Sequence, residues 1–284
     1  MLLDLVVENE IECVARNIPD AEGPATLSDG RLFVVAPSKG KIIQVLPGGV
    51  TRDIVQYEGG LPTGMQVDRN DDLIVADMKM GILRVSLDGK ITSMVSEFEG
   101  KRIRGCNDVY FDSQGNLYFS APAGSNNVAP VGELYVRLRD EHVIKLDDGF
   151  AFSNGLAVSA DDRMLVVAET FSKSLYAYDI EGPGRLSKKR LWAKLPGEHR
   201  GGPDGMDFDS QGNLLVANWG GGAIEVFDTF GQHIDRIELP FKQPSNLHFA
   251  GPGSNELYVT EHNTNAVWRL DWDNAGQMQY GWAM

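Results

Sequence analysis

One strand pattern occurs six times along the chain, and this repetition limits the fold more than any other feature. Each copy has a polar turn, then a short apolar strand, then a strand in which apolar and polar residues alternate. In the clearest copy the turn Asp209 to Asn213 precedes the apolar strand that starts at Leu214. Asp, Asn, Ser and Gly favour such turns because they bond the local backbone or accept a positive φ. The six apolar strands begin near Leu32, Leu73, Leu117, Leu165, Leu214 and Leu257.

Repeats of about 40–50 residues that each supply four short antiparallel strands are typical of a β-propeller. We therefore predict an all-β fold, a six-bladed β-propeller with four strands per blade, and one domain over residues 1–284. A large β-sandwich also has evenly spaced strands, but it does not account for six copies of one pattern. A strand around Ile11 to Ala15 is expected to join the last blade, where Gln277 to Trp282 would add another strand. This closure would remove the free edges of the sheets.

The charge and composition restrict the partners. The net charge of −14 argues against nucleic acid and anionic membranes, which bind basic surfaces. No apolar stretch approaches the roughly 18 residues that a membrane span needs, and the stretch Met1 to Glu8 is too short and too acidic for a signal peptide. Cys13 and Cys106 do not suggest a disulfide scaffold, so we expect a cytoplasmic protein. A closed ring needs no partner at its edges, and we expect a monomer.

The positions where the inner strands begin are polar in every copy. Inner strands of a propeller converge on its axis, so equivalent positions in different blades face one another. These positions lie ten to twelve residues before each apolar strand and are Glu22, Thr63, Asn107, Asn154, Asp204 and the pair Ser245–Asn246. Two carboxylates and two carboxamides among them form an oxygen-rich set that suits Ca²⁺, whereas Zn²⁺ would prefer His or Cys. The alternative is that these residues only cap strands and hydrate a channel, which would leave the acids poorly satisfied.

Several short motifs match one family in order along the chain. They include Ala21-Glu22-Gly23-Pro24, Gly105-Cys106-Asn107-Asp108, Ser153-Asn154-Gly155, Asp204-Gly205-Met206-Asp207, Ala217-Asn218-Trp219-Gly220 and Ser245-Asn246-Leu247-His248-Phe249. The chain resembles the calcium-dependent six-bladed propeller hydrolases of the gluconolactonase and senescence-marker-protein superfamily. Within that superfamily it is most similar to the branch that hydrolyses organophosphorus triesters and fluorophosphates.

The resemblance implies two calcium sites and a substrate pocket. The ligands of the catalytic Ca²⁺ would be Glu22, Asn107, Asn154 and Asp204. A structural Ca²⁺ would lie near Asp207, His248 and the carbonyl of Leu247. The pocket would be walled by Leu61, Met78, Phe152, Trp219, Ser245 and His262, although Met78, Phe152 and Trp219 could equally be ordinary core residues.

The expected activity is Ca²⁺-dependent hydrolysis of a small organophosphorus ester, with Asp204 as nucleophile or general base. A lactonase that uses the same ion is the first alternative, and a non-catalytic Ca²⁺-binding propeller is the second. Three features depart from the resemblance, and the loop Ala36 to Lys41 is one of them because it is short. The segment Ser125 to Gly132 is short, which leaves one pocket wall open to question. Gly105 stands where the gluconolactonase branch places an Arg, which weakens the lactone alternative.

Overall fold

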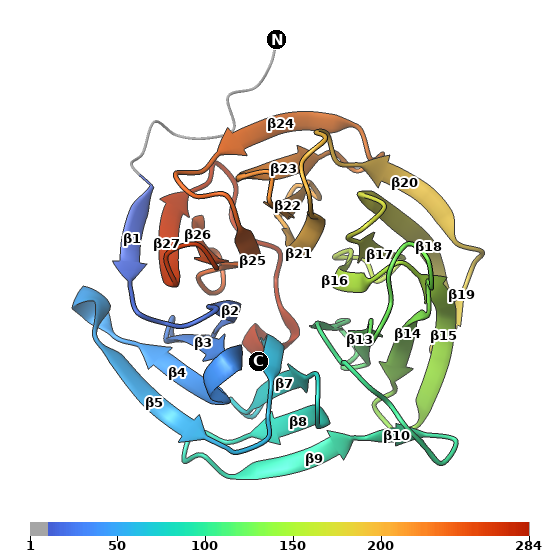
Figure 1. Cartoon of the computed structure of the whole chain (residues 1–284), viewed down its shortest axis with the longest axis horizontal. Coiled ribbons are helices and arrows are strands. Elements are labelled where there is room, and N and C mark those ends of the chain that lie inside the picture. The colour runs from blue at the N-terminus through green and yellow to red at the C-terminus, as the bar shows by residue number, and fades with distance from the viewer. Residues whose placement is uncertain (1–10, 284) are drawn as a thin grey trace.

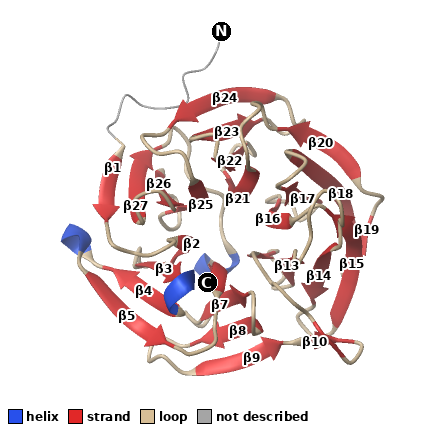
Figure 2. Ribbon diagram, viewed as in Figure 1, coloured by secondary structure: helices blue, strands red, loops and turns tan. Residues whose placement is uncertain are grey.

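Six antiparallel sheets surround one axis in the computed structural model, which describes residues 11–283 (Figure 1). Five of the sheets have four strands and one has five, which confirms the prediction of a six-bladed propeller. Nearly all of the regular structure is strand (Figure 2). The helices are single 3₁₀ turns, namely η1 (Pro37–Lys39), η2 (Pro47–Gly49) and η3 (Tyr280–Trp282). The stretch of residues 1–8, on which the signal-peptide argument rests, lies outside the described residues.

In blades one to three the first strand of each blade is innermost and the last is outermost (Figure 1). Blade one consists of β2 (Glu22–Thr26), β3 (Leu32–Ala36), β4 (Lys41–Val45) and β5 (Thr51–Gln56). Blade two consists of β6 (Pro62–Val67), β7 (Leu73–Asp77), β8 (Gly81–Val85) and β9 (Ile91–Val95). A small hairpin follows, made of β10 (Glu97–Phe98) and β11 (Lys101–Arg102). Blade three consists of β12 (Val109–Phe111), β13 (Leu117–Ala121), β14 (Gly132–Arg137) and β15 (Val143–Phe150).

Blades four and five repeat the same order, and blade six is completed from the other end of the chain. Blade four consists of β16 (Ser153–Val158), β17 (Met164–Glu169), β18 (Ser174–Gly182), β19 (Arg185–Leu186) and β20 (Arg190–Lys194). Blade five consists of β21 (Gly202–Phe208), β22 (Leu214–Trp219), β23 (Ala223–Phe227) and β24 (His233–Glu238). Blade six consists of β25 (Pro244–Phe249), β26 (Glu256–Glu261), β27 (Ala266–Asp271) and β1 (Glu12–Ala15).

The ring closes as predicted through β1, in which Cys13 pairs with Trp268 of β27. The second part of that expectation is wrong, because Gln277 to Trp282 forms no strand of blade six. The outer edge of that blade is already occupied by β1, so no edge is left for another strand. The segment instead turns into the centre of the ring (Figure 1), where the Gln277 amide donates to the Phe208 carbonyl at 2.9 Å.

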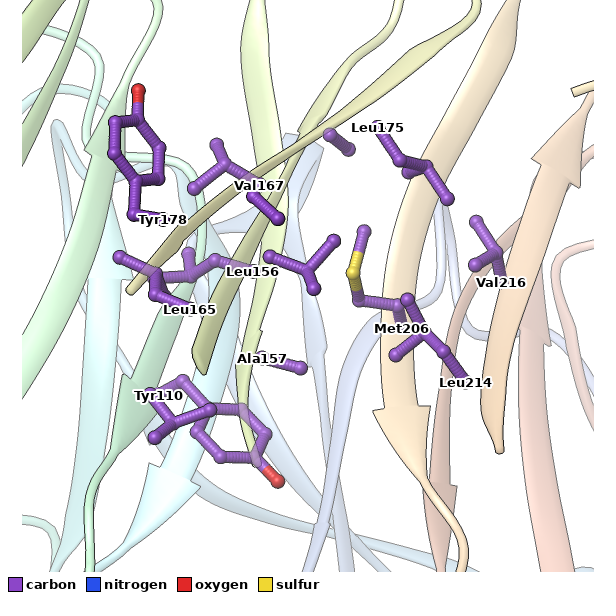
Figure 3. Packing of buried hydrophobic residues seen from close by; sticks show 14 of the residues in the cluster. Tyr110, Leu156, Ala157, Leu165, Val167, Leu175, Tyr178, Met206, Leu214 and Val216 are labelled. Carbon is purple, nitrogen blue, oxygen red and sulfur yellow. The ribbon is translucent and has the colours of Figure 1, made fainter. Parts of the chain in front are cut away.

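The hydrophobic core lies between neighbouring blades. The strand β21 is buried along its whole length, because it has a blade on either side and the rest of its own sheet behind it. In Figure 3, Leu156 and Val167 of blade four lie beside Met206 and Val216 of blade five, and all belong to one buried cluster. Each such fully buried aliphatic side chain stabilises the fold by roughly 1.5–3 kcal/mol. Over residues 11–283 we find no helix long and apolar enough to cross a membrane.

Candidate metal centre

Five of the six inner strands carry the same irregularity at the positions predicted to face the axis. The pairing with the second strand shifts between Glu22 and Ala25, Pro62 and Met65, Ser153 and Leu156, Pro203 and Met206, and Pro244 and Asn246. A β-bulge turns a side chain away from its normal alternation. Glu22, Asn154 and Asp204 all lie within these shifts, so the same local feature can direct each of them toward the axis.

Glycine follows these residues because neighbouring inner strands touch there. A Cβ on Gly205, which follows Asp204, would lie 1.9 Å from Oδ1 of Asn246 in the next blade. A Cβ on Gly64 would lie 2.1 Å from Oδ1 of Asp108. Distances this short exclude any side chain, so glycine lets the blades close tightly around the axis.

Three buried carboxylates influence one another at this level, one more than predicted. Glu22 and Asp204 are buried, and Asp108 is buried beside them. Burial, together with the nearby Asp108 carboxylate, raises the pKa of Glu22 to about 8. Burial also raises the pKa of Asp204 well above its usual range, with Glu22 and Asp108 as further causes. None of the ion pairs within residues 11–283 involves these three acids.

The amides at this level are held from behind. Asn154 Nδ2 donates to Thr170 Oγ1 at 3.0 Å, and Thr170 in turn donates to the Pro203 carbonyl at 2.8 Å, next to Asp204. Oδ1 of Asn154, an acceptor, takes no part in these two hydrogen bonds. The Thr63 hydroxyl donates to the Asn107 carbonyl at 2.7 Å and so fixes the backbone of that residue.

The donor chemistry of this group fits a hard cation. Buried carboxylates that raise one another's pKa are stabilised by a nearby positive charge, and carboxylate and amide oxygens are ligands of Ca²⁺. Among the described residues, no three Asp, Glu, His or Cys side chains are grouped so that they could hold a metal ion alone. Any cation at this level would therefore use the amide oxygens of Asn107 and Asn154 as well as the acids.

A second group fits a cation further along the same channel. The Thr26 hydroxyl donates to the Phe249 carbonyl at 3.2 Å, so the 3.2 Å contact between Thr26 and His248 Nε2 must use a proton on that nitrogen. Nδ1 of His248 is then an acceptor, and it lies 3.5 Å from Oδ2 of Asp207. That oxygen is buried without a hydrogen-bond partner. Two buried acceptors that face each other need a cation or a proton between them.

The residues predicted to form the pocket lie at the same end of the sheets as Glu22 and Asp204. In the sheet register, Gly202 pairs with Trp219, Pro62 with Asp77, and Pro244 with Glu261. Trp219, Met78 and His262 therefore lie at the end of a second strand, opposite the start of an inner strand. The structure brings Trp219 and His262 together, with Trp219 Nε1 donating to His262 Nδ1 at 3.1 Å.

The remaining residues predicted to line the pocket are Leu61, Phe152 and Ser245. The Met78 amide donates to the Leu61 carbonyl at 3.0 Å, so these two are neighbours. The Phe152 ring lies 5.3 Å from that of Phe171. Ser245 is fully buried, and its hydroxyl donates to the Ala21 carbonyl at 2.7 Å. Ser245 therefore supports the strand that carries Glu22.

Sequence reasoning missed Asp108 and Gln279. Asp108 follows a predicted ligand directly, and its position beside Glu22 depends on how the inner strands of different blades pack. Gln279 donates from Nε2 to Asp207 Oδ1 at 2.9 Å, across 72 residues of sequence. Gln279 lies after the six repeats, so no equivalent position in another blade points to its contact with Asp207.

Comparison with known proteins gives a consistent family match. The family model described as "SMP-30/Gluconolactonase/LRE-like region" matches residues 21–263. Diisopropyl-fluorophosphatase of Loligo vulgaris is 43% identical, over 97% of this chain and 96% of that protein. Gluconolactonase of Zymomonas mobilis is 28% identical, over 93% of this chain and 82% of that protein.

Solved structures support the same fold. A calcium-binding protein, regucalcin, from Agrobacterium tumefaciens superposes with a TM-score of 0.83 at 20% identity, covering 99% of this chain and 100% of that one. A gluconolactonase from Xanthomonas campestris also gives a TM-score of 0.83 at 22% identity, covering 94% of this chain and 91% of that one.

Proposed function

The chain belongs to the SMP-30/gluconolactonase/LRE-like family, and from that premise we propose that it is a Ca²⁺-dependent hydrolase of organophosphorus triesters and fluorophosphates. The observation that carries the proposal is the group of buried, unpaired acids at the axis, Glu22 and Asp204 with Asp108 beside them. The substrate class is supported by the 43% identity to diisopropyl-fluorophosphatase.

Glu22, Asn107, Asn154 and Asp204 would hold the catalytic Ca²⁺. When bound, the ion would polarise the P=O oxygen of the substrate as a Lewis acid. The two neutral amides contribute oxygen ligands without further negative charge, so they would not over-neutralise the ion. Met78, Trp219 and His262 would form apolar and aromatic walls that orient the ester groups and exclude water.

Asp204 is the residue we assign to the chemical step. As a nucleophile, its Oδ would form a bond to phosphorus while the P–F bond breaks and fluoride leaves, and water would then hydrolyse the resulting aspartyl phosphate. As a general base, it would take a proton from the attacking water while fluoride leaves. Both routes consume one water and release fluoride and a dialkyl phosphate. A positive charge beside Asp204 would keep it ionised for either role.

We assign the second cation a structural role at Asp207, His248 and the Leu247 carbonyl. The buried acceptors Asp207 Oδ2 and His248 Nδ1 support this assignment. A cation there would tie blade five to blade six, because Asp207 lies on β21 and His248 on β25.

Lactone hydrolysis at the same ion is the second candidate, supported by the similarity to gluconolactonases. The site disfavours lactone hydrolysis at Gly105, the position where the gluconolactonase branch is expected to carry an Arg. Gly105 has a φ of 73°, and a Cβ there would lie 2.7 Å from that of Ala123, so this backbone leaves no room for a side chain. Arg104, the neighbouring residue, is exposed and lines a separate surface hollow beside Lys101.

The test compares both substrate types on one protein sample. Fluoride release from diisopropyl fluorophosphate and ring opening of small lactones would be measured with Ca²⁺ and after chelation. We expect fluoride release that chelation abolishes and added Ca²⁺ restores. Lactone opening alone would replace the proposal with the second candidate. Hydrolysis that is indifferent to chelation would reject the metal centre, and tight Ca²⁺ binding without any hydrolysis would indicate a binding protein.

A further inference from the structure

We propose that residues 276–283 form a clasp that closes the far end of the channel and controls the release of a cation held between Asp207 and His248. The inference rests on the proposed function for the presence of that cation. It concerns residues that the function did not require, since the clasp lies at the opposite end of the inner strands from Asp204.

The clasp contacts every blade of the ring. The Gln277 amide donates to the Phe208 carbonyl of blade five at 2.9 Å, and its side chain donates to the Val158 carbonyl of blade four at 2.9 Å. The Tyr280 ring lies 4.7 Å from that of Phe111 in blade three.

The remaining contacts complete the circle. Gly281 lies against the backbone of Val67 in blade two, so closely that a Cβ on it would be 2.4 Å from the Val67 carbonyl. Trp282 Nε1 donates to the Thr26 carbonyl of blade one at 2.8 Å. The Trp282 ring also lies 5.4 Å from that of His248 in blade six. In Figure 1 the segment accordingly occupies the centre of the ring.

One clasp residue fixes the orientation of Asp207. Oδ1 of Asp207 accepts hydrogen bonds from Gln279 Nε2 at 2.9 Å, Tyr110 at 3.1 Å and the Phe208 amide at 3.0 Å. Three donors on one oxygen leave the other, Oδ2, directed at His248. Gln279 is therefore a positioning residue for the cation site, because it acts through the carboxylate rather than on the ion.

The space beside these acceptors lies between two sets of buried contacts. A cavity of about 10 Å³, enough for one water or ion, lies between the levels of Asp108 and Asp207. On the side of the catalytic acids, Asn246 donates to Asp108 at 3.4 Å across the channel. On the other side lie Gln279 and Trp282, both buried. An ion can leave on that side only if the clasp detaches.

The experiment measures the rate of Ca²⁺ release. Ca²⁺-loaded protein would be mixed with an excess of a chelator that fluoresces on binding Ca²⁺. We expect a fast phase from the catalytic site and a slow phase from the clasped site. Trp282→Ala and Gln279→Met should accelerate the slow phase at least about tenfold and leave the fast phase unchanged. The first removes the buried hydrogen bond to Thr26, and the second removes the hydrogen bonds to Tyr110 and Asp207. Met278→Ala is the matched control, since that side chain in the same segment is 57% exposed.

Hydrogen exchange at the Gln277 amide, which donates to Phe208 of blade five, would report clasp opening independently of the metal. If this amide exchanges faster in a folded Trp282→Ala protein while the slow phase is unchanged, the clasp does not control release and the proposal is wrong. If Trp282→Ala does not fold, Gln279→Met decides, because it retains the bulk of the side chain. Wild-type protein that holds no Ca²⁺ by elemental analysis would instead reject the proposed function.

Discussion

Gly155 lies directly against the main-chain carbonyl of Asp204, so closely that a Cβ on Gly155 would be 2.1 Å from that oxygen. The contact joins the inner strands of blades four and five at the metal centre. Gly155→Ala would therefore push the backbone of Asp204 outward by several tenths of an ångström or more. We expect hydrolysis to fall about 100-fold, because small misplacements of a reacting group are costly. Ca²⁺ affinity should fall in parallel, measured by titration calorimetry.

A glycine with free space around it provides the control for this variant. Gly30 has a φ of 84°, and no atom lies within 4 Å of the position that a Cβ would take there, so Gly30→Ala adds backbone strain without a collision. It should lose roughly 1 kcal/mol of stability and retain its activity. If Gly155→Ala remains as active as Gly30→Ala, the two inner strands are not in the contact described.

Asp204→Asn tests the residue assigned to the chemical step. The substitution retains shape and one oxygen ligand but removes the charge that would attack phosphorus or accept a proton. We expect a loss of at least about three orders of magnitude in kcat, with weaker but measurable Ca²⁺ binding. Stopped-flow or electrode detection of fluoride at saturating Ca²⁺ would measure it.

Asp108→Asn tests whether the loss in Asp204→Asn comes from a missing reacting group or only from a missing charge. Like Asp204→Asn, it removes one negative charge beside Glu22, but Asp108 is not among the proposed ligands. Its kcat at saturating Ca²⁺ should stay within about tenfold of wild type, since only the field at the site changes. Equal losses in the two variants would show that charge, rather than a reacting carboxylate, explains the effect of Asp204→Asn.

The six blades were predictable because each repeat carries its own strand and turn signals within a few residues. The closing strand β1 was also predictable, since an incomplete last blade leaves an open edge. The path of the segment after β27 was not predictable from the sequence. Its polar residues find partners at Val158, Phe208 and Thr26, which come together only once the ring exists.

The candidate metal centre was predictable for a related reason. Equivalent positions of a repeat face one another at the axis, so Glu22 and Asp204 could be paired without a structure. Asp108 could not, because two adjacent polar residues precede β12 and only the ring geometry decides that the second lies beside Glu22. The contact from Gln279 to Asp207 could not be predicted for the same reason.

The two cysteines should differ sharply in reactivity. Burial raises the pKa of the Cys106 thiol to about 12, with the Asp77 carboxylate as the next cause, and its side chain is fully enclosed. The reactive thiolate is therefore scarce between about pH 7 and 9, and the enclosure keeps reagent away, so Cys106 should stay almost unlabelled over that range. Cys13 is half-buried and should react in the native protein.

Ellman titration would check this difference. We expect one thiol to react in native protein, two in guanidinium, and none in native Cys13→Ser protein. Rapid labelling of native Cys13→Ser at pH 8 would show that the site around Cys106, next to the proposed ligand Asn107, opens readily.

The largest effect on stability outside the channel is expected at Glu225 in blade five. This carboxylate is fully buried and accepts hydrogen bonds from Arg236, from Asn218 at 2.8 Å and from His233 at 2.7 Å. Glu225→Gln would remove the charge from the buried acceptor of three hydrogen bonds and put an amide donor in place of one of its oxygens, so we expect a loss of about 3 kcal/mol in the free energy of unfolding. Glu238→Gln is the matched control because Glu238 pairs with the same arginine at 2.6 Å but is 66% exposed. It should cost less than about 1 kcal/mol. Chemical denaturation of both variants measures the difference, and equal losses would contradict the dominant role of the buried carboxylate.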